Sequence, residues 1–386
     1  MLSSSYTPLT GGAETYMRLL AEGLVAQGHE ATVVTDGSWL PAEPTSELMN
    51  GVELLRLNEF AGELDQRDKV RWRRMQYAVL DELADRLAGV PDLVHANSHE
   101  TLLLASMIAL EHDVPLVASL HEQNPDIEAY GRGRCRLAYD VLPVDAFLAG
   151  SDFYRKRAVA FGAPEDRLHL IYHGVEVPEP SFETRERGRL RFGVPHGVPL
   201  VVCPGRIYTR KGQVDLVAAF ATVRAAVPGA RLLLAGRVSD FAYAINLDAL
   251  IERLGLSDAV EIVGDLTERD MPEVMAAADL IAQPSLEEGL GLAAIEAMSW
   301  ARPVVACNVV GLEEVFTHEV DGLLVPARDP KRLSDAILRL LHDPVLAARL
   351  GAEARQTVIK RFSQQAMVRD TLRAYQAARS HREVTS

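Results

Sequence analysis

The chain has 386 residues, of which 48% are hydrophobic and 24% are charged, and its formal net charge is −14. This length and composition indicate a globular protein with room for two domains, each with its own core. The acidic balance argues against nucleic-acid binding and against a general attraction to anionic lipid.

The sequence also bears on where the protein works. It contains neither an apolar run of about 20 residues, which a transmembrane helix needs, nor the basic and apolar start of a signal peptide. Its three cysteines, Cys135, Cys203 and Cys307, lie far apart and lack the spacing of a metal site or a disulfide framework. We therefore expect a cytoplasmic protein.

Two basic stretches interrupt an acidic first half. Residues 1–172 hold 26 acidic and 15 basic residues, yet residues 67–74 and 132–136 are locally basic. Either stretch is compatible with an ordinary solvated surface. Either also leaves open an anionic acceptor or a contact with a membrane surface, which would place the protein at the inner face of the membrane as a peripheral protein.

Strand and helix patterns alternate in the first half, which predicts βαβ units around a parallel sheet. We predict strands at residues 30–35, 93–96, 116–120 and 146–149, and helices at 13–27 and 69–87. Few residues precede Gly11 and Gly12, so an opening strand is unusually short or the true start of the chain lies upstream. Gly28 is expected to end the first helix as a C-cap.

A second alternating series follows a predicted linker at residues 175–193, which is rich in proline and charge. We predict strands at 200–203, 231–235, 260–263, 280–283, 304–306 and 322–325. We predict helices at 212–226, 247–254, 271–278 and 292–299. Two such sheets joined by a linker leave a cleft, where ligands bind at the carboxyl ends of the strands. The amphipathic stretch 364–378 is expected to pack back on the first domain.

Two carboxylates bracket the start of the predicted helix 292–299. Glu288 precedes a Gly-Leu-Gly sequence and Glu296 follows eight residues later, a distance of roughly 12 Å at the helical rise. The free amides at a helix N-terminus bind anions, and glycines let a phosphate approach the backbone. A nucleoside diphosphate sugar has about this reach, with its sugar near one carboxylate and its ribose near the other.

Two other interpretations of this segment stay open. The run from Gly289 to Ala294 also matches the dinucleotide fingerprint G-x-G-x-x-A, with Glu313 about 20 residues further on. That fingerprint normally follows the first strand of a Rossmann unit, whereas this run follows a later strand. The glycines are also compatible with a loop that serves only to make a turn.

A basic loop precedes this segment, with Arg206 and Lys211 directly after the strand predicted at 200–203. Guanidinium and ammonium groups at that edge can neutralise a diphosphate. Because the chain has no Asp-x-Asp pair, we predict a site without a metal, in which cationic side chains replace the metal ion.

The first half offers two further candidates. Gly11 and Gly12 form a flexible loop at a helix start, suited to the approach of a phosphate or sugar. His121 lies just beyond a strand end, where open α/β sheets bind ligands. A single histidine is more often structural than functional, and this applies more strongly to His95 and His99.

Together these segments resemble the retaining GT-B glycosyltransferases of family 4 along nearly the whole chain. The matching motifs run in order: Gly11-Gly12-Ala-Glu14, Asp92 to His95, Leu120-His121, Ala149 to Ser151, Ile171 to Val175, Gly205-Arg206 with Lys211-Gly212, Gly264, Pro284-Ser285, and Glu288 to Glu296. The last is the E-x7-E signature. The sequence departs from the family pattern at His173, where asparagine is usual, and at Val310, where glycine is usual.

The resemblance implies an α/β fold of the GT-B type, with two Rossmann-like domains that face each other across a cleft. Residues 1–175 would bind the acceptor and residues 190–362 the nucleotide-sugar donor. A C-terminal helix at 363–380 would return to the first domain. No cofactor is implied beyond the donor substrate.

The resemblance also implies roles for individual residues. Arg206 and Lys211 would hold the diphosphate, Glu288 would orient the donor sugar, and Glu296 would bind the ribose. His121 would line the cleft at the reacting sugar, and Gly11 and Gly12 would face the diphosphate. Backbone contacts to the donor would come from Gly289, Leu290, Gly291 and Leu292.

We thus predict a retaining, metal-independent glycosyltransferase that uses front-side displacement on a hydroxyl acceptor. A nucleotide-sugar epimerase can share the two-domain architecture, and a nicotinamide-dependent oxidoreductase would use the Gly289 fingerprint. The sequence does not define the nucleotide base, the sugar, the acceptor or the oligomeric state.

Overall fold

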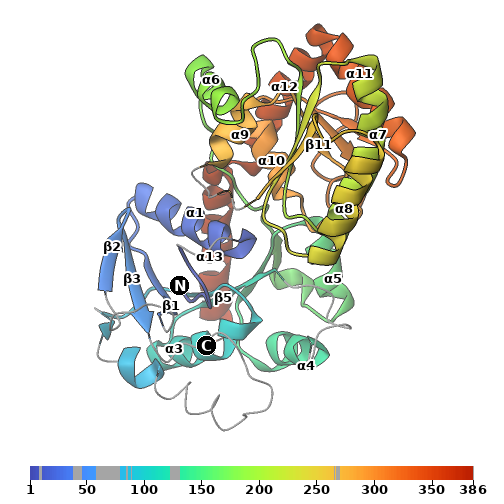
Figure 1. Ribbon diagram of the computed structural model, residues 1–386. Coiled ribbons are helices and arrows are strands. Elements are labelled where there is room, and N and C mark those ends of the chain that lie inside the picture. The colour runs from blue at the N-terminus through green and yellow to red at the C-terminus, as the bar shows by residue number, and fades with distance from the viewer. Residues whose placement is uncertain are drawn as a thin grey trace. The chain divides into compact units, whose positions relative to one another are not determined.

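The structure is a computed structural model that describes residues 1–7, 11–37, 46–57, 79–83, 86–87, 89–121, 131–264, 266 and 270–385. The chain forms two compact units (Figure 1). The first combines Met1–Gly174 with Gln364–Ser386, and the second is Val175–Ser363.

Parallel strands form the centre of the first unit. Its strands are β1 (Thr32–Asp36), β2 (Ser46–Met49), β3 (Val52–Leu57), β4 (Val94–Ala96), β5 (Leu116–Leu120), β6 (Ala146–Ala149) and β7 (Leu168–Leu170). They pair in the orders β1-β3-β2 and β4-β5-β6-β7, and only β2 runs antiparallel to its neighbour. Leu2 bridges both Val34 and Ala96 in parallel, so the first residues lie between β1 and β4. At the place of the expected opening strand the structure thus shows this bridge at Leu2, outside the named strands.

Helices bury their apolar faces against these strands. They are α1 (Gly12–Ala26), α3 (His99–His112), α4 (Gly131–Arg136) with the π-helical turn η1 (Leu137–Val141), and α5 (Asp152–Ala160). In α1 the predicted apolar face of Tyr16, Leu19, Leu20 and Leu24 is buried, which supports the amphipathic spacing. Most of the helix predicted at 69–87, and the basic stretch 67–74, lie outside the described residues.

The last helix, α13 (Gln364–Thr385), belongs to the first unit, as expected. It contacts α1, β5 and β6 and contributes Met367, Val368, Ala374 and Ala378 to a buried apolar cluster. The contact with α1 is close, because a Cβ added at Gly23 would lie 2.5 Å from Cγ2 of Val368. The helix extends beyond the predicted end because its final turns remain packed: His381 bonds to Asp145 at 3.1 Å.

The second unit contains one sheet of six parallel strands in the order β10-β9-β8-β11-β12-β13. The strands are β8 (Leu200–Pro204), β9 (Arg231–Ala235), β10 (Val260–Val263), β11 (Leu280–Gln283), β12 (Val304–Cys307) and β13 (Leu323–Val325). All six predicted strands are confirmed to within one residue at each end. The inner strands β8, β11 and β12 are buried along their whole length and are almost wholly apolar, whereas the edge strand β10 contains the exposed Glu261.

The helices of the second unit flank this sheet (Figure 1). They are α7 (Gln213–Ala226), α8 (Phe241–Arg253), α9 (Met271–Ala277), α10 (Leu292–Ser299), α11 (Pro330–His342) and α12 (Pro344–Thr357), with the short turns η3 (Thr209–Lys211) and η4 (Val358–Phe362). The core lies between the sheet and α7, α8, α11 and α12, with Phe220 and Leu232 fully buried. The predicted alternation of strand and helix therefore holds from β8 to β12, and β13 follows β12 without a helix between them.

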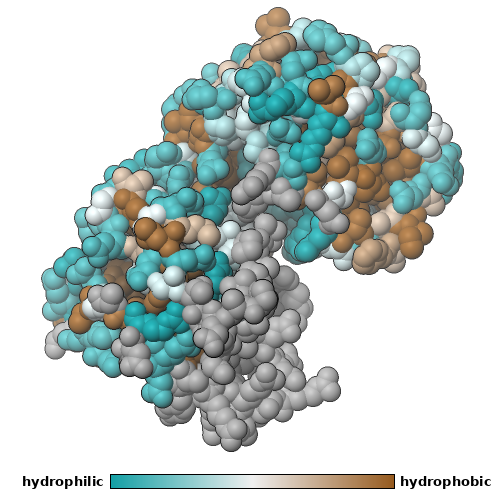
Figure 2. Space-filling view, turned by 60° about the vertical axis from the view of Figure 1, so that its left-hand side comes forward, coloured by the Kyte–Doolittle hydropathy of each residue, from teal (hydrophilic) through white to brown (hydrophobic). Residues whose placement is uncertain are grey.

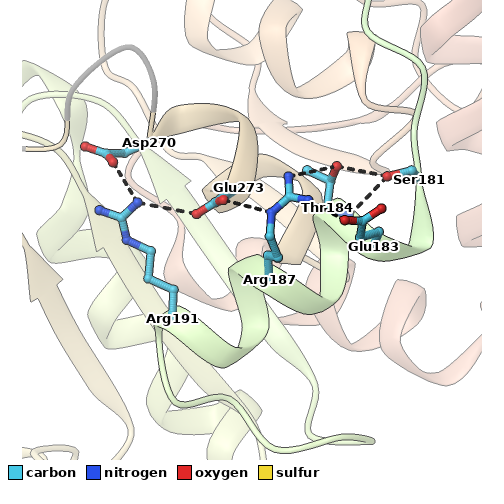
Figure 3. Close-up of polar contacts among 7 residues, drawn as sticks. All are labelled: Ser181, Glu183, Thr184, Arg187, Arg191, Asp270 and Glu273. Carbon is cyan, nitrogen blue, oxygen red and sulfur yellow. Dashed lines mark hydrogen bonds and ion pairs between the residues drawn. The ribbon is translucent and has the colours of Figure 1, made fainter.

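The predicted linker at residues 175–193 is wrong in its second half, which forms helix α6 (Phe182–Arg191) and packs on α9. Figure 3 shows the polar side of this contact, where Arg187 pairs with Glu273 at 3.2 Å and Arg191 pairs with Asp270 at 2.6 Å. At Gly188 an added Cβ would collide with the carbonyl oxygen of Glu273. The charged residues that suggested a linker thus belong to a helix pair with complementary charges.

Hydrophilic residues cover most of the face in Figure 2, with smaller hydrophobic patches between them. Exposed apolar side chains include Phe241 and Ile245 on α8 and Val141 in η1. Among the described residues, every helix is too short or too polar to cross a bilayer.

Candidate active site

An ion pair in the second unit joins the two loops that the sequence singled out. Lys211 ends η3, which follows β8, and Glu288 follows β11, the neighbouring strand in the sheet. Lys211 Nζ lies 2.6 Å from Glu288 Oε1, with the two side chains only 14% and 10% exposed. A charge pair that is largely shielded from water interacts more strongly than one on the surface. The predicted proximity of these two residues is thus present in the fold.

Two further side chains orient the Glu288 carboxylate. Ser285 Oγ donates to Glu288 Oε1 at 2.6 Å, and Gln283 Nε2 donates to the same oxygen at 3.2 Å. Gln283 Nε2 also donates to Ser285 Oγ at 2.9 Å, and both side chains are buried. One carboxylate oxygen therefore accepts from three donors, which restricts the carboxylate to one orientation.

Glycines bring the backbones of these loops together. Gly212 has a φ of +66°, and a Cβ there would collide with the carbonyl oxygen of Pro284. Gly311 has a φ of +89°, and a Cβ there would lie 2.5 Å from the carbonyl oxygen of Glu288. Only glycine combines this left-handed conformation with such close approach. The positions of Lys211 and Glu288 thus depend on these two glycines.

Helix α10 begins shortly after Glu288, with three residues between them. Gly291 is its N-cap with a φ of +85°, and Leu292 is the first helical residue. The amides at this end lack acceptors within the helix, so they form an anion-binding end. Glu296 lies in the second turn and is partly exposed. The predicted distance of roughly 12 Å assumed that all eight steps between Glu288 and Glu296 are helical. In the structure only the last four steps are helical, so this distance does not follow from the helical rise.

Arg206 lies at the same edge of the sheet and has a different environment. Its side chain is exposed, and its guanidinium lies 5.1 Å from the centroid of the Tyr208 ring. Its carbonyl oxygen accepts from Gln213 Nε2 at 2.9 Å. In the structure Arg206 thus stacks on Tyr208, while Lys211 contacts Glu288. Arg210, whose guanidinium lies 5.4 Å from the centroid of the same ring, pairs with Glu287 at 3.2 Å on the surface.

The predicted residues of the first unit centre on His121, directly after β5. Its Nε2 lies 2.8 Å from Oδ1 of Asn97, which follows β4. The ring makes edge contacts with Tyr16 and His173, each with 4.9 Å between centroids. His173 also packs against Tyr16 at 4.6 Å. Three rings from separate segments therefore hold one another at the carboxyl end of β5.

His95 and His173 are both structural and uncharged near neutral pH. His95 Nε2 lies 2.7 Å from Ser119 Oγ and its Nδ1 lies 2.7 Å from the hydroxyl of Tyr375 on α13. Burial lowers the pKa of His95 to about 3, and burial with the charge of His121 lowers the pKa of His173 well below 6.5. The low weight given to His95 as a site residue agrees with this buried network.

Gly11 and Gly12 begin α1 at the surface of the first unit. Gly11 is the N-cap and has extended backbone, and both glycines are exposed. A Cβ at Gly11 would collide with the carboxylate of Glu14, which accepts from Ser5 Oγ at 2.5 Å. The absence of a side chain at Gly11 therefore leaves room for the Glu14 carboxylate beside the helix start.

The predicted site residues thus fall into two groups. His121, Gly11 and Gly12 belong to the first unit, and the remaining ones belong to the second. Among the residues that the structure describes, His, Cys, Asp and Glu do not form a group of three that could hold a metal ion. Metal independence of the reaction remains a prediction.

The sequence analysis missed Gln283 and Asn97 as site residues and did not assign a role to Ser285. Each is a small polar side chain at the end of a parallel strand, a position where ligands and their supporting groups gather. Gln283 and Ser285 lie within five residues of Glu288 along the chain. This closeness to Glu288 along the chain could have indicated a role for both residues. The sequence alone does not show which side chains turn toward the carboxylate.

Two family models match the chain. The model for glycosyltransferase family 4 matches residues 10–178, and the model for glycosyl transferases group 1 matches residues 185–357. The matches cover both units and include every residue of the candidate site.

Individual proteins agree with the family models. A D-inositol 3-phosphate glycosyltransferase from Xylanimonas cellulosilytica is 30% identical over 92% of this chain and 91% of its own length. A GDP-mannose-dependent alpha-(1-6)-phosphatidylinositol monomannoside mannosyltransferase from Mycobacterium tuberculosis is 28% identical over 98% and 99%. The crystal structure of Anabaena HepE with UDP-glucose superimposes with a TM-score of 0.76 at 23% identity, over 96% and 97%.

The chain therefore belongs to the group 1 glycosyltransferases, with the GT-B fold and an N-terminal part of the family 4 type. The predicted α/β fold with two Rossmann-like units is confirmed. The roles of the individual site residues are proposals.

Proposed function

We propose that this glycosyltransferase moves a sugar from a nucleoside diphosphate to a hydroxyl acceptor with retention of anomeric configuration and without a metal ion. The observation that carries the proposal is the shielded Lys211–Glu288 pair, 2.6 Å apart, beside the N-terminal end of α10. It combines a cation for phosphate, a carboxylate for sugar hydroxyls and free amides at one edge of a sheet.

The donor would be bound by this combination. Lys211 exchanges Glu288 for the diphosphate when the donor binds, and the freed carboxylate oxygen then accepts from sugar hydroxyls. Ser285 and Gln283 keep the carboxylate in place during this exchange. Arg206 turns from Tyr208 to the diphosphate, the amides of residues 289–292 face the donor, and Glu296 binds the ribose. His121 contacts the reacting sugar, with Gly11 and Gly12 facing the diphosphate.

The reaction would follow front-side displacement. The bond between the anomeric carbon and the donor phosphate oxygen breaks, and the acceptor oxygen attacks the same face. The departing diphosphate gains charge and takes the proton of the acceptor hydroxyl. Lys211, Arg206 and the α10 amides stabilise that charge, and one preorganised donor of this kind is worth about 3 kcal/mol in the transition state.

The names of similar proteins suggest where to look for substrates. The name of one relative contains D-inositol 3-phosphate, and the name of another contains GDP-mannose and phosphatidylinositol monomannoside. One structural neighbour was solved with UDP-glucose. We propose a hexose donor carried by UDP or GDP and an acceptor among polyol phosphates, glycolipids or glycans. An acceptor on a lipid would place this protein at the inner membrane face, and a free acceptor would place it in the cytoplasm.

Product analysis tests this proposal. The protein is incubated with UDP- and GDP-hexoses in EDTA, with and without a panel of inositol phosphates, glycolipids and glucans. We expect an acceptor that gains one hexose, with the anomeric configuration of the donor by NMR. An epimerised donor without any acceptor would support the epimerase alternative, and an inverted linkage would overturn retention.

A further inference from the structure

The loop after β8 carries Tyr208 between Arg206 and Lys211, the two residues proposed to bind the diphosphate. Tyr208 is the N-cap of η3, where its backbone is extended, and its carbonyl oxygen accepts from the amide of Lys211 at 2.9 Å. The preceding Ile207 is fully buried, and its amide donates to the carbonyl oxygen of Arg237 at 2.9 Å. Because the backbone is held on both sides of Tyr208, its ring has a defined place at the carboxyl edge of the sheet.

Two guanidinium groups lie near this ring. Those of Arg206 and Arg210 are 5.1 Å and 5.4 Å from its centroid, within the range of a cation–π attraction. Arg210 also pairs with Glu287 at 3.2 Å, so a carboxylate balances its charge. Arg206 is exposed, and within the described part of the chain its guanidinium has no ion pair. Arg206 is therefore the cation that can leave the ring most readily.

An aromatic face holds an exposed cation only weakly. Such a contact changes an equilibrium constant by about 2- to 5-fold. The hydrogen bonds from a guanidinium to a phosphate are charge-assisted and much stronger, so a diphosphate would displace Tyr208 as the partner of Arg206. A ligand gains only the difference between the bound and the free state, and a contact that is lost on binding therefore lowers its affinity.

We propose that Tyr208 is a positioning residue that holds Arg206 in the free enzyme, lowers the affinity for the diphosphate and takes Arg206 back when the product leaves. The inference rests on the proposed function, in which Arg206 turns to the diphosphate of the donor. Lys211 has a corresponding partner in Glu288, at 2.6 Å, so each of the two cations exchanges a protein contact for phosphate. Because product release is the slow step of many enzymes, a competing partner for Arg206 would help the nucleoside diphosphate to leave.

Affinity for the free nucleoside diphosphate tests this role. UDP and GDP are titrated by calorimetry into wild type, Tyr208→Leu and Tyr208→Phe. We expect Tyr208→Leu to bind the diphosphate about 2- to 5-fold more tightly, and its product-inhibition constant to fall by the same factor. Tyr208→Phe keeps the aromatic face and loses only the hydroxyl, so its affinity should stay close to that of the wild type.

This readout separates a positioning role from a structural one. Damage to the loop would weaken binding, whereas loss of the competing contact strengthens it. An unchanged or weaker affinity in Tyr208→Leu would overturn the inference. Equal tightening in Tyr208→Phe would overturn it too, because the aromatic face is still present in that variant.

The effect of Tyr208 must also depend on Arg206. In the Arg206→Gln background the guanidinium is absent, so the further change Tyr208→Leu should leave the affinity for the diphosphate unchanged. Tightening that persists in this background would mean that Tyr208 acts on the diphosphate without Arg206, and would contradict the proposal.

A second measurement uses the wild-type protein and does not depend on the folding of Tyr208→Leu. In protein with ¹³C- and ¹⁵N-labelled arginine, the ring current of Tyr208 should move the side-chain signals of Arg206 upfield in the free enzyme. The Arg206→Gln variant identifies these signals by their loss. Saturation with UDP or GDP should move them back, and signals that stay unchanged on saturation would overturn the inference.

The outcomes separate the two proposals. A wild type that binds neither UDP nor GDP and transfers no sugar would overturn the proposed function and the inference with it. A wild type that binds and transfers, beside a Tyr208→Leu protein with no gain in affinity, would overturn only the role of Tyr208.

Discussion

A single oxygen of Glu288 accepts from Lys211, Ser285 and Gln283, although these residues come from two different loops. Lys211 can leave for a phosphate, but Ser285 and Gln283 are buried and have little freedom to move. In the proposed donor complex, these two neutral donors would keep the carboxylate from following Lys211. We therefore treat Ser285 as a group that orients the carboxylate rather than one that touches the sugar.

Replacement of Ser285 by alanine tests this role. We expect kcat to fall about 10- to 150-fold, because loss of a hydrogen bond to a charged group costs about 1.5 to 3 kcal/mol. Affinity for the free nucleoside diphosphate, measured by calorimetry, should change little because Lys211 remains. Ser299→Ala is the matched control: Ser299 is also buried in this unit and donates at 2.7 Å to the backbone oxygen of Glu296. Equal rates for Ser285→Ala and Ser299→Ala would refute the orienting role.

His95 makes the stability of the first unit depend on pH. Its pKa is about 3 in the folded chain and 6.5 when unfolded, so below pH 6.5 the unfolded chain binds a proton that the folded chain does not. The stabilisation is complete above pH 6.5 and is lost progressively toward pH 3. Between pH 7.5 and pH 5.5 this group should lower the free energy of unfolding by about 1.4 kcal/mol.

The pH effect is measured as a difference between proteins. The whole protein is unfolded in urea at both pH values, and the unfolding is followed by pulsed hydrogen exchange. The urea midpoint of the first unit is read from peptides that contain β4 and β5, and peptides that contain β8 serve as the internal reference. In His95→Gln, the drop in the unfolding free energy between the two pH values should shrink by about 1.4 kcal/mol. An unchanged drop would mean that His95 is not the titrating group.

At the level of elements, the site depends on loops that pass close to each other. Gly311 lies between β12 and α11 and packs on the backbone of Glu288, just before α10. Gly212 makes a similar approach to Pro284 after β11. These backbone contacts thus hold the loops together at the carboxyl edge of the second sheet, and the loops in turn determine where the side chains of the candidate site lie.

The variant Gly311→Ala tests this assembly. Its left-handed φ and the collision with Glu288 should lower the free energy of unfolding by about 2 kcal/mol and reduce donor turnover. Gly229→Ala is the control, because a Cβ at that exposed glycine would meet no atom within 4 Å. Thermal unfolding and initial rates give the comparison. A Gly311→Ala protein as stable and active as Gly229→Ala would contradict the account.

The elements differ in how far the sequence predicts them. In the second unit β8, β11 and β12 are buried along their whole length, so their apolar runs reveal them in the sequence. Strand β3 was not predicted because Glu53 and Arg56 interrupt its apolar run; Arg56 is nevertheless 3% exposed, since it pairs with Glu47 on β2 at 2.8 Å. Helix α6 was taken for a linker because its charges are paired only after folding. Lys211 and Glu288 could be predicted from loop positions, whereas Asn97 and Gln283 became visible only through their contacts.

In the whole molecule, the chain forms the first unit, then the second, and returns to the first through α13. The two ends of the chain thus share one unit, and the candidate donor site lies within the uninterrupted second unit. A donor bound by Lys211, Glu288 and α10 would contact one continuous segment of chain, Val175–Ser363.

The central claim is that Lys211 carries the charge of the departing diphosphate. The most direct measurement is the rate of nucleoside diphosphate release from the preferred sugar nucleotide, compared between wild type, Lys211→Ala and Arg210→Ala. Arg210 is the matched control, because it is the preceding residue of η3 and pairs with Glu287 on the surface. We predict that Lys211→Ala stays folded and loses about 100- to 1000-fold in kcat, while Arg210→Ala stays within about 3-fold of wild type. A folded Lys211→Ala protein with near-normal turnover would contradict the account.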